Sequence, residues 1–407
     1  MRAFAWFVFV AFVSPIAAAE PAPNRKPVVV TEEALRIHSE SLVIDGHNDL
    51  PWELRKKDAG ASFRTIDLLK PQKALHTDIP RLRKGGVGAQ FWSAWVPVET
   101  IKNGTAVKTT LEQIDAIHRM VKQYPNDFEL ALNTSDIERI HKSGKIASLI
   151  GIEGGHSIDG SLEILRNYHR LGVRYMTLTH SESLAWADSA TDTPKCGGLS
   201  KFGETIVAEM NAMGMLVDLS HVSPDCMKAV LKVAKAPVIF SHSSARSVAD
   251  HPRNVPDDVL KLLKPNGGVV MANFYSGFIV PEGARAMRKM FDVGRELKKK
   301  FPDDDVKYQE AMRQWQKDND YPAGTIHTLV DHIDRIVQVA GIDHVGLGSD
   351  YDGISRLPAQ LEDVSCYPNI TQELLNRGYK AADIKKILGG NLMRAFRAAE
   401  KAAAPSR

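Results

Sequence analysis

The pattern that most constrains the fold is an eightfold repetition of short apolar runs, each followed by a longer amphipathic segment. Short runs that are apolar throughout are typical of strands buried on both faces of a parallel sheet, and the segments between them have helical spacing. The runs are 42–49, 87–92, 146–153, 173–180, 215–221, 238–242, 269–274 and 345–350. Eight such repeats predict a closed (β/α)8 barrel of the TIM type rather than an open doubly wound sheet.

Ionisable side chains end six of the eight runs. They are His47 with Asp49, Glu153, His180, His221, His242 and Asp350. In a (β/α)8 barrel the carboxyl ends of all strands open onto one face, which carries the active site. A single histidine at a strand end is commonly structural, but ionisable residues at six equivalent positions predict one shared site.

The residue types at these strand ends predict a metal centre. His47 and Asp49 are two positions apart in an extended segment, so their side chains point toward one spot. Zinc favours histidine nitrogen and carboxylate oxygen, and the two oxygens of Glu153 suit a bridge between two ions. We therefore expect two zinc ions bridged by Glu153, one held by His47 and Asp49 and the other by His221 and His242. The alternatives are a salt bridge at a helix N-terminus for Glu153 and a buried structural role for His47.

The N-terminal residues have the pattern of a secretory signal peptide. A positive charge, a short apolar run and the small residues Ala17-Ala18-Ala19 follow in order within residues 1–19. We expect cleavage there, export to the periplasm or the medium, and a single catalytic barrel domain over residues 20–407. The apolar run is shorter than the roughly 20 residues that span a bilayer, and the C-terminus lacks the apolar tail of a glycolipid-anchor signal, so we expect no stable membrane anchor.

The charge and cysteine content of the chain limit its binding partners and its disulfides. The net charge is +3 and no basic stripe with interleaved aromatic residues occurs, so we do not expect nucleic acid as a partner. The three cysteines, Cys196, Cys226 and Cys366, are scattered, allow at most one internal disulfide, and receive no functional assignment.

The repeat is interrupted between residues 281 and 322, after the seventh run. Basic, acidic and helical stretches alternate there, which predicts an extra helical insertion. Such an insertion would lie near the mouth of the site or form a solvated pair of surface helices, and mixed charge favours the second interpretation.

Several long motifs together resemble the membrane (renal-type) dipeptidase family, zinc metallopeptidases related to the amidohydrolase superfamily. They are 43–52, 151–158, 175–180 with 186–188, 218–223, 240–244, 253–258 and 346–353. The resemblance extends from about Thr31 to about Ala399. It implies a zinc-dependent dipeptidase with a binuclear centre in a (β/α)8 barrel.

The resemblance also implies roles for three residues. His180 would contact substrate and stabilise the tetrahedral intermediate, Arg253 would bind the terminal carboxylate of the substrate, and Asp350 would hydrogen-bond the metal-bridging water and handle its proton. The alternatives are a buried structural histidine for His180 and a surface ion pair for Arg253. Asp352 competes with Asp350 for the catalytic role but lies past the strand end.

The expected activity is hydrolysis of dipeptides with a free C-terminal carboxylate by a metal-bridged hydroxide. Two other functions stay open: an amidohydrolase acting on N-acyl amino acids or β-lactams, and a non-catalytic exported protein that binds metal or solute. The chain lacks the disulfide cysteines and the C-terminal signal of the mammalian members, and its 281–322 segment is longer than theirs. The preference for particular substrate side chains and the number of subunits therefore stay open, and a homodimer is one possibility.

Overall fold

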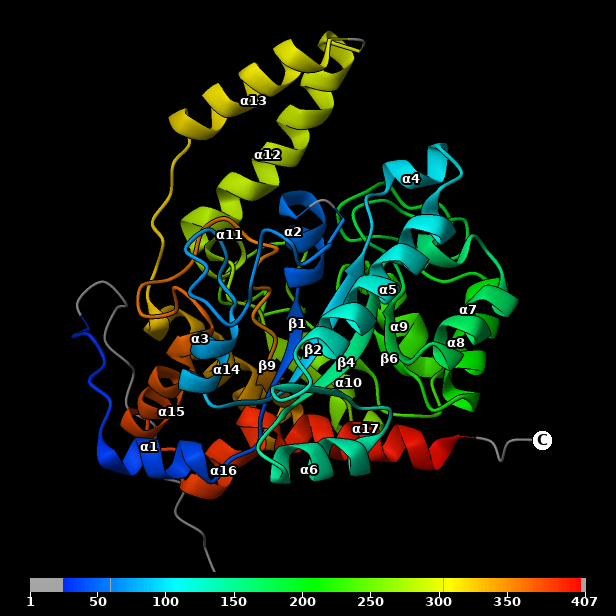
Figure 1. Ribbon diagram of the computed structural model, residues 1–407. Helices are drawn as coiled ribbons and strands as arrows, with labels where there is room; N and C mark the ends of the chain where they lie inside the picture. The colour runs from blue at the N-terminus through cyan, green and yellow to red at the C-terminus, as the bar shows by residue number, and fades with distance from the viewer. Residues whose placement is uncertain (1–24, 59, 303, 404–407) are drawn as a thin grey trace, which may run out of the picture.

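The computed structural model describes residues 25–58, 60–302 and 304–403. Nine parallel strands form one sheet in which eight strands close into a barrel (Figure 1). The strands are β1 (Val43–Asn48), β2 (Val87–Trp95), β3 (Phe128–Leu130), β4 (Ile146–Glu153), β5 (Val173–Thr177), β6 (Leu216–Asp218), β7 (Ile239–Phe240), β8 (Val269–Ala272) and β9 (Val345–Leu347). Each barrel strand corresponds to one of the eight predicted runs, so the (β/α)8 prediction is confirmed.

The barrel closes between β2 and β4. Their parallel register extends from the pair Ala89 and Ala147 to the pair Trp95 and Glu153, while β2 pairs on its other side with β1. The ninth strand, β3, lies outside the barrel and pairs with β4. The sequence pattern missed β3 because a three-residue strand with a central glutamate does not form an apolar run.

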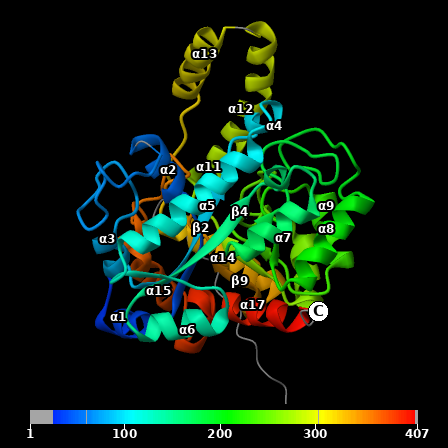
Figure 2. The ribbon, with the colours of Figure 1, turned by 45° about the vertical axis from the view of Figure 1, so that its right-hand side comes forward.

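Helices surround the barrel (Figures 1 and 2). They are α1 (Glu32–Ser39), α2 (Leu50–Lys57), α3 (Ile79–Lys84), α4 (Glu99–Lys102), α5 (Ala106–Gln123), α6 (Thr134–Lys142), α7 (Leu162–Arg170), α8 (Lys201–Ala212), α9 (Pro224–Val233), α10 (Asp257–Asn266), α11 (Ser276–Ile279), α12 (Pro281–Lys300), α13 (Asp305–Asp318), α14 (Ile326–Ala340), α15 (Tyr367–Asn376), α16 (Ala381–Lys385) and α17 (Asn391–Ala402). Apart from α12 and α13, these helices pack their apolar faces on the barrel, whose strands are buried along almost their whole length.

The C-terminal helix lies across the amino-terminal end of the barrel (Figure 1). The chain from residue 381 to residue 402 is not one continuous helix, because it is broken between α16 and α17 at Gly389. The backbone of Gly389 passes so close to β1 that an added Cβ would lie 2.2 Å from the carbonyl oxygen of Leu42. After the break, Phe396 packs on Phe91 with ring centroids 6.5 Å apart. This packing closes one end of the barrel and leaves the carboxyl end for a site.

Several strands end two or three residues before the predicted ionisable side chain. His221 and Asp350 have positive φ angles of 69° and 66°, a left-handed conformation that an extended strand cannot contain. The chain therefore turns at these residues, and their side chains stand at the rim of the barrel.

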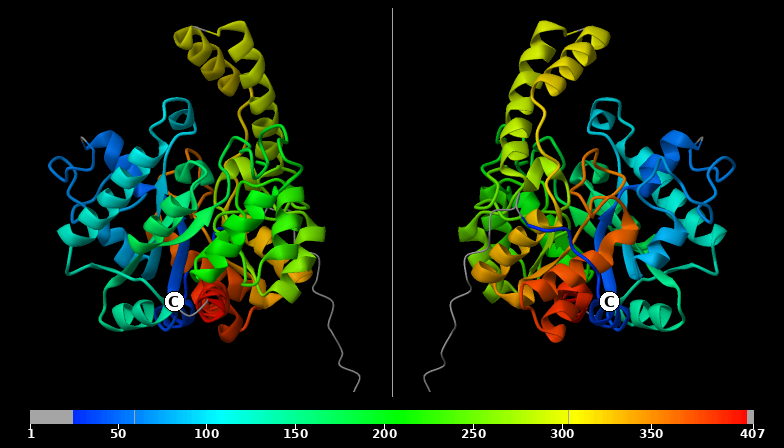
Figure 3. Two further views of the ribbon diagram at one scale, coloured as in Figure 1. Left: turned by 90° about the vertical axis from the view of Figure 1, so that its right-hand side faces the viewer. Right: turned by 90° about the vertical axis from the view of Figure 1, so that its left-hand side faces the viewer.

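The segment after β8, the seventh barrel strand, confirms the predicted helical insertion. Helices α12 and α13 pack together as a hairpin that projects beyond the carboxyl end of the barrel (Figures 1 and 3). The side chains of Ala284 and Met287 are buried at its base, whereas most of the outer residues are half-buried or exposed.

The signal peptide, the membrane anchor and the cysteines were also considered in the sequence. The predicted signal peptide, residues 1–19, lies outside the described residues. None of the helices in the described part of the chain combines the length and the apolarity that crossing a bilayer requires. Cys196, Cys226 and Cys366 are free thiols.

Candidate metal centre

A pocket of about 520 Å³ opens at the carboxyl end of the barrel. Its lining includes most of the residues predicted from the strand ends, namely Asp49, Glu153, His180, His221, His242, Arg253 and Asp350. His47 lies fully buried beneath them. The fold thus brings together all eight predicted site residues, although their individual roles stay predictions.

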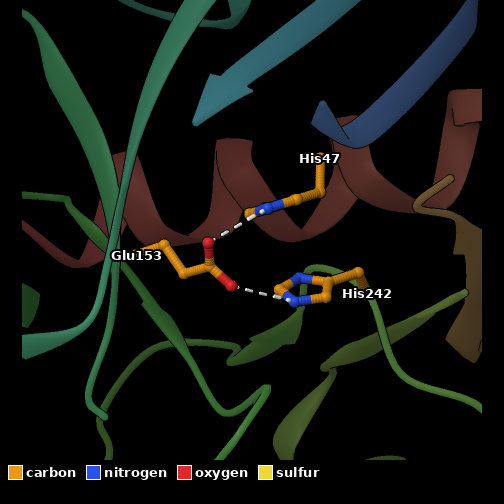
Figure 4. Close-up of side chains that lie close together, drawn as sticks. All are labelled: His47, Glu153 and His242. Carbon is orange, nitrogen blue, oxygen red and sulfur yellow. Dashed lines mark ion pairs between the residues drawn. The ribbon is translucent and has the colours of Figure 1, made fainter. Parts of the chain in front are cut away.

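Glu153, the last residue of β4, lies between the histidines (Figure 4). Its Oε2 atom faces Nε2 of His47 at 3.5 Å. Its Oε1 atom lies 2.8 Å from Nε2 of His221 and 3.2 Å from Nε2 of His242. On the first side, Nε2 of His47 is also 3.3 Å from Oδ2 of Asp49. The two carboxylate oxygens therefore face two different groups of donor atoms.

Hydrogen bonds on the far side of two imidazoles fix their orientation. Nδ1 of His47 lies 2.8 Å from the hydroxyl of Tyr175, and Nδ1 of His242 lies 2.8 Å from the hydroxyl of Ser241. Ser241 in turn donates to Asp218 at 2.6 Å. Both imidazoles consequently turn Nε2 toward Glu153. Partners of this kind raise the affinity of a histidine for a metal ion.

These supporting residues were not predicted individually. Asp218 and Tyr175 both lay inside motifs that carried the family resemblance, but neither was given a role, and the buried strand pattern around Tyr175 also fits a core residue. Tyr175 fits inside the barrel because Gly151 on the neighbouring strand lacks a side chain. A Cβ on Gly151 would come within 2.0 Å of the Tyr175 ring.

The donor atoms fit a bound cation. Nε2 of His47 and Oδ1 of Asp49 are buried without a hydrogen-bond partner, and buried polar atoms are rarely left so. Three sets of side chains bring ligand atoms within 4.8 Å of one another: His47, Glu153 and His242; Glu153, His180 and His221; and His47, Asp49 and Asp350. Glu153 and His47 each belong to two of these sets, and of the two only Glu153 has a pair of oxygen atoms that could reach two ions.

The electrostatics favour positive charge at the centre. Burial alone would lower the pKa of His47, but Tyr175 and the carboxylates of Asp49 and Glu153 outweigh it and raise that pKa well above its ordinary value. An environment that binds a proton tightly at Nε2 also favours a metal ion there. Burial lowers the pKa values of His221 and His242 well below the ordinary value, so both rings are neutral at pH 7, the form that ligates metals.

Asp350 lies at the rim of the same cluster. Burial and the charges of Asp49 and Glu153 raise its pKa to about 8. Nδ2 of Asn273 donates a hydrogen bond to its Oδ2 atom at 2.8 Å and holds the carboxyl group in place. Asp352, the competing aspartate, instead accepts a 2.7 Å hydrogen bond from the backbone of His76, so its carboxylate is engaged with a surface loop.

Arg253 and His180 border the pocket. Burial lowers the pKa of Arg253 to about 10, which leaves the guanidinium charged at neutral pH. Its Nη2 donates to the carbonyl of His242 at 3.2 Å, and its buried Nε has no partner. This excludes the surface ion pair considered for Arg253. Burial also lowers the pKa of His180 to about 4, so this imidazole is neutral.

A closed α/β barrel that gathers histidines and carboxylates around a pocket at its carboxyl end is the arrangement of barrel metallohydrolases. The sequence profile of the membrane dipeptidase family, peptidase family M19, matches residues 31–407. The chain belongs to this family and is a metallo-dipeptidase, a hydrolase.

Relatives of known sequence and structure agree. Dipeptidase 3 of Mus musculus and that of Rattus norvegicus are each 41% identical over 375 residues, which cover 91% of this chain and 67% of each relative. The probable dipeptidase PvdM from Pseudomonas aeruginosa superposes with a TM-score of 0.79 at 24% identity, covering 91% of this chain and 98% of its own. A metallo peptidase from Rhodobacter sphaeroides, solved with a phosphinate mimic of the dipeptide L-Ala-D-Ala, superposes with a TM-score of 0.72 at 22% identity. The match covers 88% of this chain and 99% of that one. At these identities the two structures support the fold alone.

Proposed function

We propose that the protein hydrolyses dipeptides with a free C-terminal carboxylate and uses two zinc ions bridged by Glu153. His47 and Asp49 would hold one ion, and His221 and His242 the other. The observation that carries the proposal is the orientation of Glu153, whose two oxygens face His47 on one side and His221 with His242 on the other. Histidine nitrogen and carboxylate oxygen are donors that zinc prefers.

When bound, the ions would polarise the scissile carbonyl and lower the pKa of a water molecule so that it attacks near neutral pH. Arg253 would pair with the substrate carboxylate, for which its planar fork of donors is suited. His180, neutral in this pocket, would donate a hydrogen bond to the oxyanion of the tetrahedral intermediate. Bound cations would offset the charges of Asp49 and Glu153 that raise the pKa of Asp350, so its carboxylate would accept the water proton and deliver it to the leaving amine.

Metal removal and restoration test the proposal. Protein stripped with a chelator should lose cleavage of Ala-Ala and regain it with about two equivalents of zinc, measured by zinc titration alongside amine release. Full activity of the stripped protein would contradict a metal-dependent mechanism. Restoration by one equivalent would contradict the binuclear centre but leave the activity intact.

We also propose that residues 1–19 are removed during export to the periplasm or the medium and that residues 20–407 act as a single catalytic domain. The support is the charge and apolar pattern of the first 19 residues. N-terminal sequencing of the protein recovered from the exported fraction should begin at Glu20. A mature protein that retains Met1 would contradict this proposal.

A further inference from the structure

The helical insertion contributes a side chain to the pocket. Phe291, on α12, lines it together with Tyr275 and Phe278, which belong to the segment leading into α12. All three rings are half-buried, so each exposes part of its apolar surface to the pocket. The insertion and the segment that leads into it thus form an aromatic wall, which we define as Tyr275, Phe278 and Phe291.

The aromatic wall lies beside Arg253. The Cζ atom of Arg253 lies 5.4 Å from the ring centroid of Phe278. Phe278 stacks on His251 with centroids 4.4 Å apart, and Phe291 lies 6.2 Å from the same imidazole. His251 accepts a hydrogen bond of 3.1 Å from the backbone of Arg253 through Nδ1. The rings are thus next to the group that would bind the substrate carboxylate.

Further contacts fix the insertion against this region. Arg288, one turn before Phe291, forms an ion pair with Asp250 in the loop that carries Arg253. At the base of α12, a Cβ on Gly283 would lie 2.5 Å from the carbonyl oxygen of Ser276, so the helix packs tightly on the preceding segment. These contacts hold Phe291 in register with the Arg253 loop, although the hairpin projects away from the barrel (Figure 3).

Other parts of the lining have a different character. Trp52, Glu53 and Lys56 of α2 also border the pocket, and Glu53 pairs with Lys57 at 2.8 Å. That wall mixes charged and aromatic groups, whereas the wall beside Arg253 is aromatic. The two residues of a bound dipeptide would consequently meet different surroundings.

We infer that the aromatic wall binds the side chain of the C-terminal residue of the substrate, and that Phe291 makes the enzyme prefer dipeptides whose C-terminal residue is large and apolar. The inference rests on the proposed function, because it places the substrate carboxylate on Arg253. A carboxylate held there sets the C-terminal side chain beside the three rings. Covering exposed aromatic surface with an apolar side chain is favourable, and a small or charged side chain gains less.

Steady-state kinetics with paired substrates test the inference. The variant Phe291→Ala should lower kcat/KM for Ala-Leu and Ala-Phe by about 10-fold, the scale of lost apolar contacts in a specificity pocket. It should leave Ala-Gly and the reversed substrate Phe-Ala within about two-fold of the unmodified enzyme, because neither places a large side chain on the wall. Phe291→Leu should recover part of the loss.

Met290→Ala is the matched control. Met290 precedes Phe291 on α12 but contacts Gln316 of α13 at 3.4 Å, so its loss perturbs the hairpin while the pocket wall stays intact. Its substrate profile should match that of the unmodified enzyme. Three outcomes in Phe291→Ala would overturn this inference while leaving the proposed function standing. They are an unchanged substrate profile, an equal loss of kcat/KM on all substrates, and a loss that depends on the N-terminal residue of the substrate. An unmodified, zinc-loaded enzyme that cleaves none of the dipeptides would instead overturn the proposed function.

Discussion

The hydroxyl of Tyr175 lies 2.8 Å from Nδ1 of His47, and the same hydroxyl lies 3.2 Å from the carbonyl oxygen of Gly46. A carbonyl only accepts, so the phenol donates its proton to Gly46 and accepts the Nδ1 proton of His47. The lone pair of the imidazole is then on Nε2, which faces Asp49 and Glu153. Tyr175 thus selects the tautomer of His47 that can ligate a metal ion.

Removing this hydroxyl should weaken metal binding. In Tyr175→Phe, the affinity for zinc at the His47 position should fall 10- to 100-fold, roughly the effect of losing an outer partner of a metal ligand. Competition with a chromogenic chelator measures the affinity. Tyr124→Phe serves as the control, because it removes a tyrosine hydroxyl that accepts a hydrogen bond from Leu68, away from the site. Equal zinc affinity in Tyr175→Phe and the control would show that the hydroxyl does not tune the ligand.

Replacing His47 should separate the two metal positions. His47→Ala removes a nitrogen donor from one side of Glu153 while His221 and His242 remain on the other. We expect the purified variant to hold about one zinc ion instead of two, to lack turnover, and to keep the circular dichroism spectrum of a folded barrel. Metal analysis by mass spectrometry gives the stoichiometry. Two tightly held ions in His47→Ala would refute its assignment as a ligand.

The two neighbouring aspartates should differ in function. Asp350→Asn should lower kcat by roughly 10²- to 10⁴-fold with zinc retained, since an amide cannot accept and return a proton. Asp352→Asn should keep kcat within about ten-fold and mainly lower the melting temperature, because Asp352 accepts a hydrogen bond from the loop at His76. Measurements of kcat and of the melting temperature for both variants show which aspartate has the catalytic role. A larger loss of kcat in Asp352→Asn would reverse the assignment.

The guanidinium of Arg253 should matter only for substrates with a free carboxylate. Arg253→Ala should raise KM for Ala-Ala by at least about ten-fold, since a charge-assisted pair is lost. Cleavage of the corresponding C-terminal amide should change little, because it lacks the charged partner. Initial rates over a range of concentrations of both substrates give the comparison. Equal effects of Arg253→Ala on Ala-Ala and on its C-terminal amide would favour an amidohydrolase that does not recognise the substrate carboxylate.

Mild acid should destabilise the fold through His332. Its Nδ1 accepts the backbone N–H of Ala245 at 3.0 Å and its Nε2 faces the carbonyl oxygen of Ile279 at 2.9 Å, so the buried ring is needed in its neutral form. Burial lowers its pKa from 6.5 to about 4. Above pH 6.5 the full stabilisation is present. Between pH 6.5 and 4 the unfolded chain binds a proton that the folded chain does not. The free energy of unfolding therefore decreases as the pH is lowered, in total by on the order of 3 kcal/mol.

The variant His332→Gln isolates this contribution. Compared with the unmodified protein, it should be less stable at pH 7.5 but lose less stability on acidification to pH 4.5. Denaturant unfolding of the metal-free proteins at both pH values measures the difference. His118→Gln, which changes a half-buried histidine on α5 that contacts the carbonyl oxygen of Leu171, should keep the original pH dependence. A loss on acidification as large in His332→Gln as in the unmodified protein would contradict the prediction.

Much of the barrel could be predicted from the sequence because a parallel strand buried on both faces leaves a continuous apolar run, as in Ile146–Glu153. The start of a helix can also be predicted where a capping residue is present, as at Thr31, whose side chain accepts a hydrogen bond from the backbone of Ala34. The break at Gly389 could not be predicted, because it depends on the close approach of Leu42, which is distant in sequence.

The candidate site divides in the same way. His47, Glu153 and His242 lie at or within two residues of the carboxyl ends of their strands, so their convergence follows from the barrel itself. The residues that orient them are set by contacts between strands: Tyr175 reaches His47 only across the barrel interior, and Asn273 reaches Asp350 from a neighbouring strand end. A strand pattern tells which residues point inward but not which of them meet.

The hairpin formed by α12 and α13 lies between β8 and β9, and these two strands pair in one continuous parallel register. Changes in the outer part of the hairpin therefore need not disturb the pairing of the barrel strands. A change at Phe291, in contrast, alters one wall of the pocket. If Phe291 sets the substrate preference as inferred, that preference can be altered at a position outside the barrel core, at little cost to the stability of the barrel.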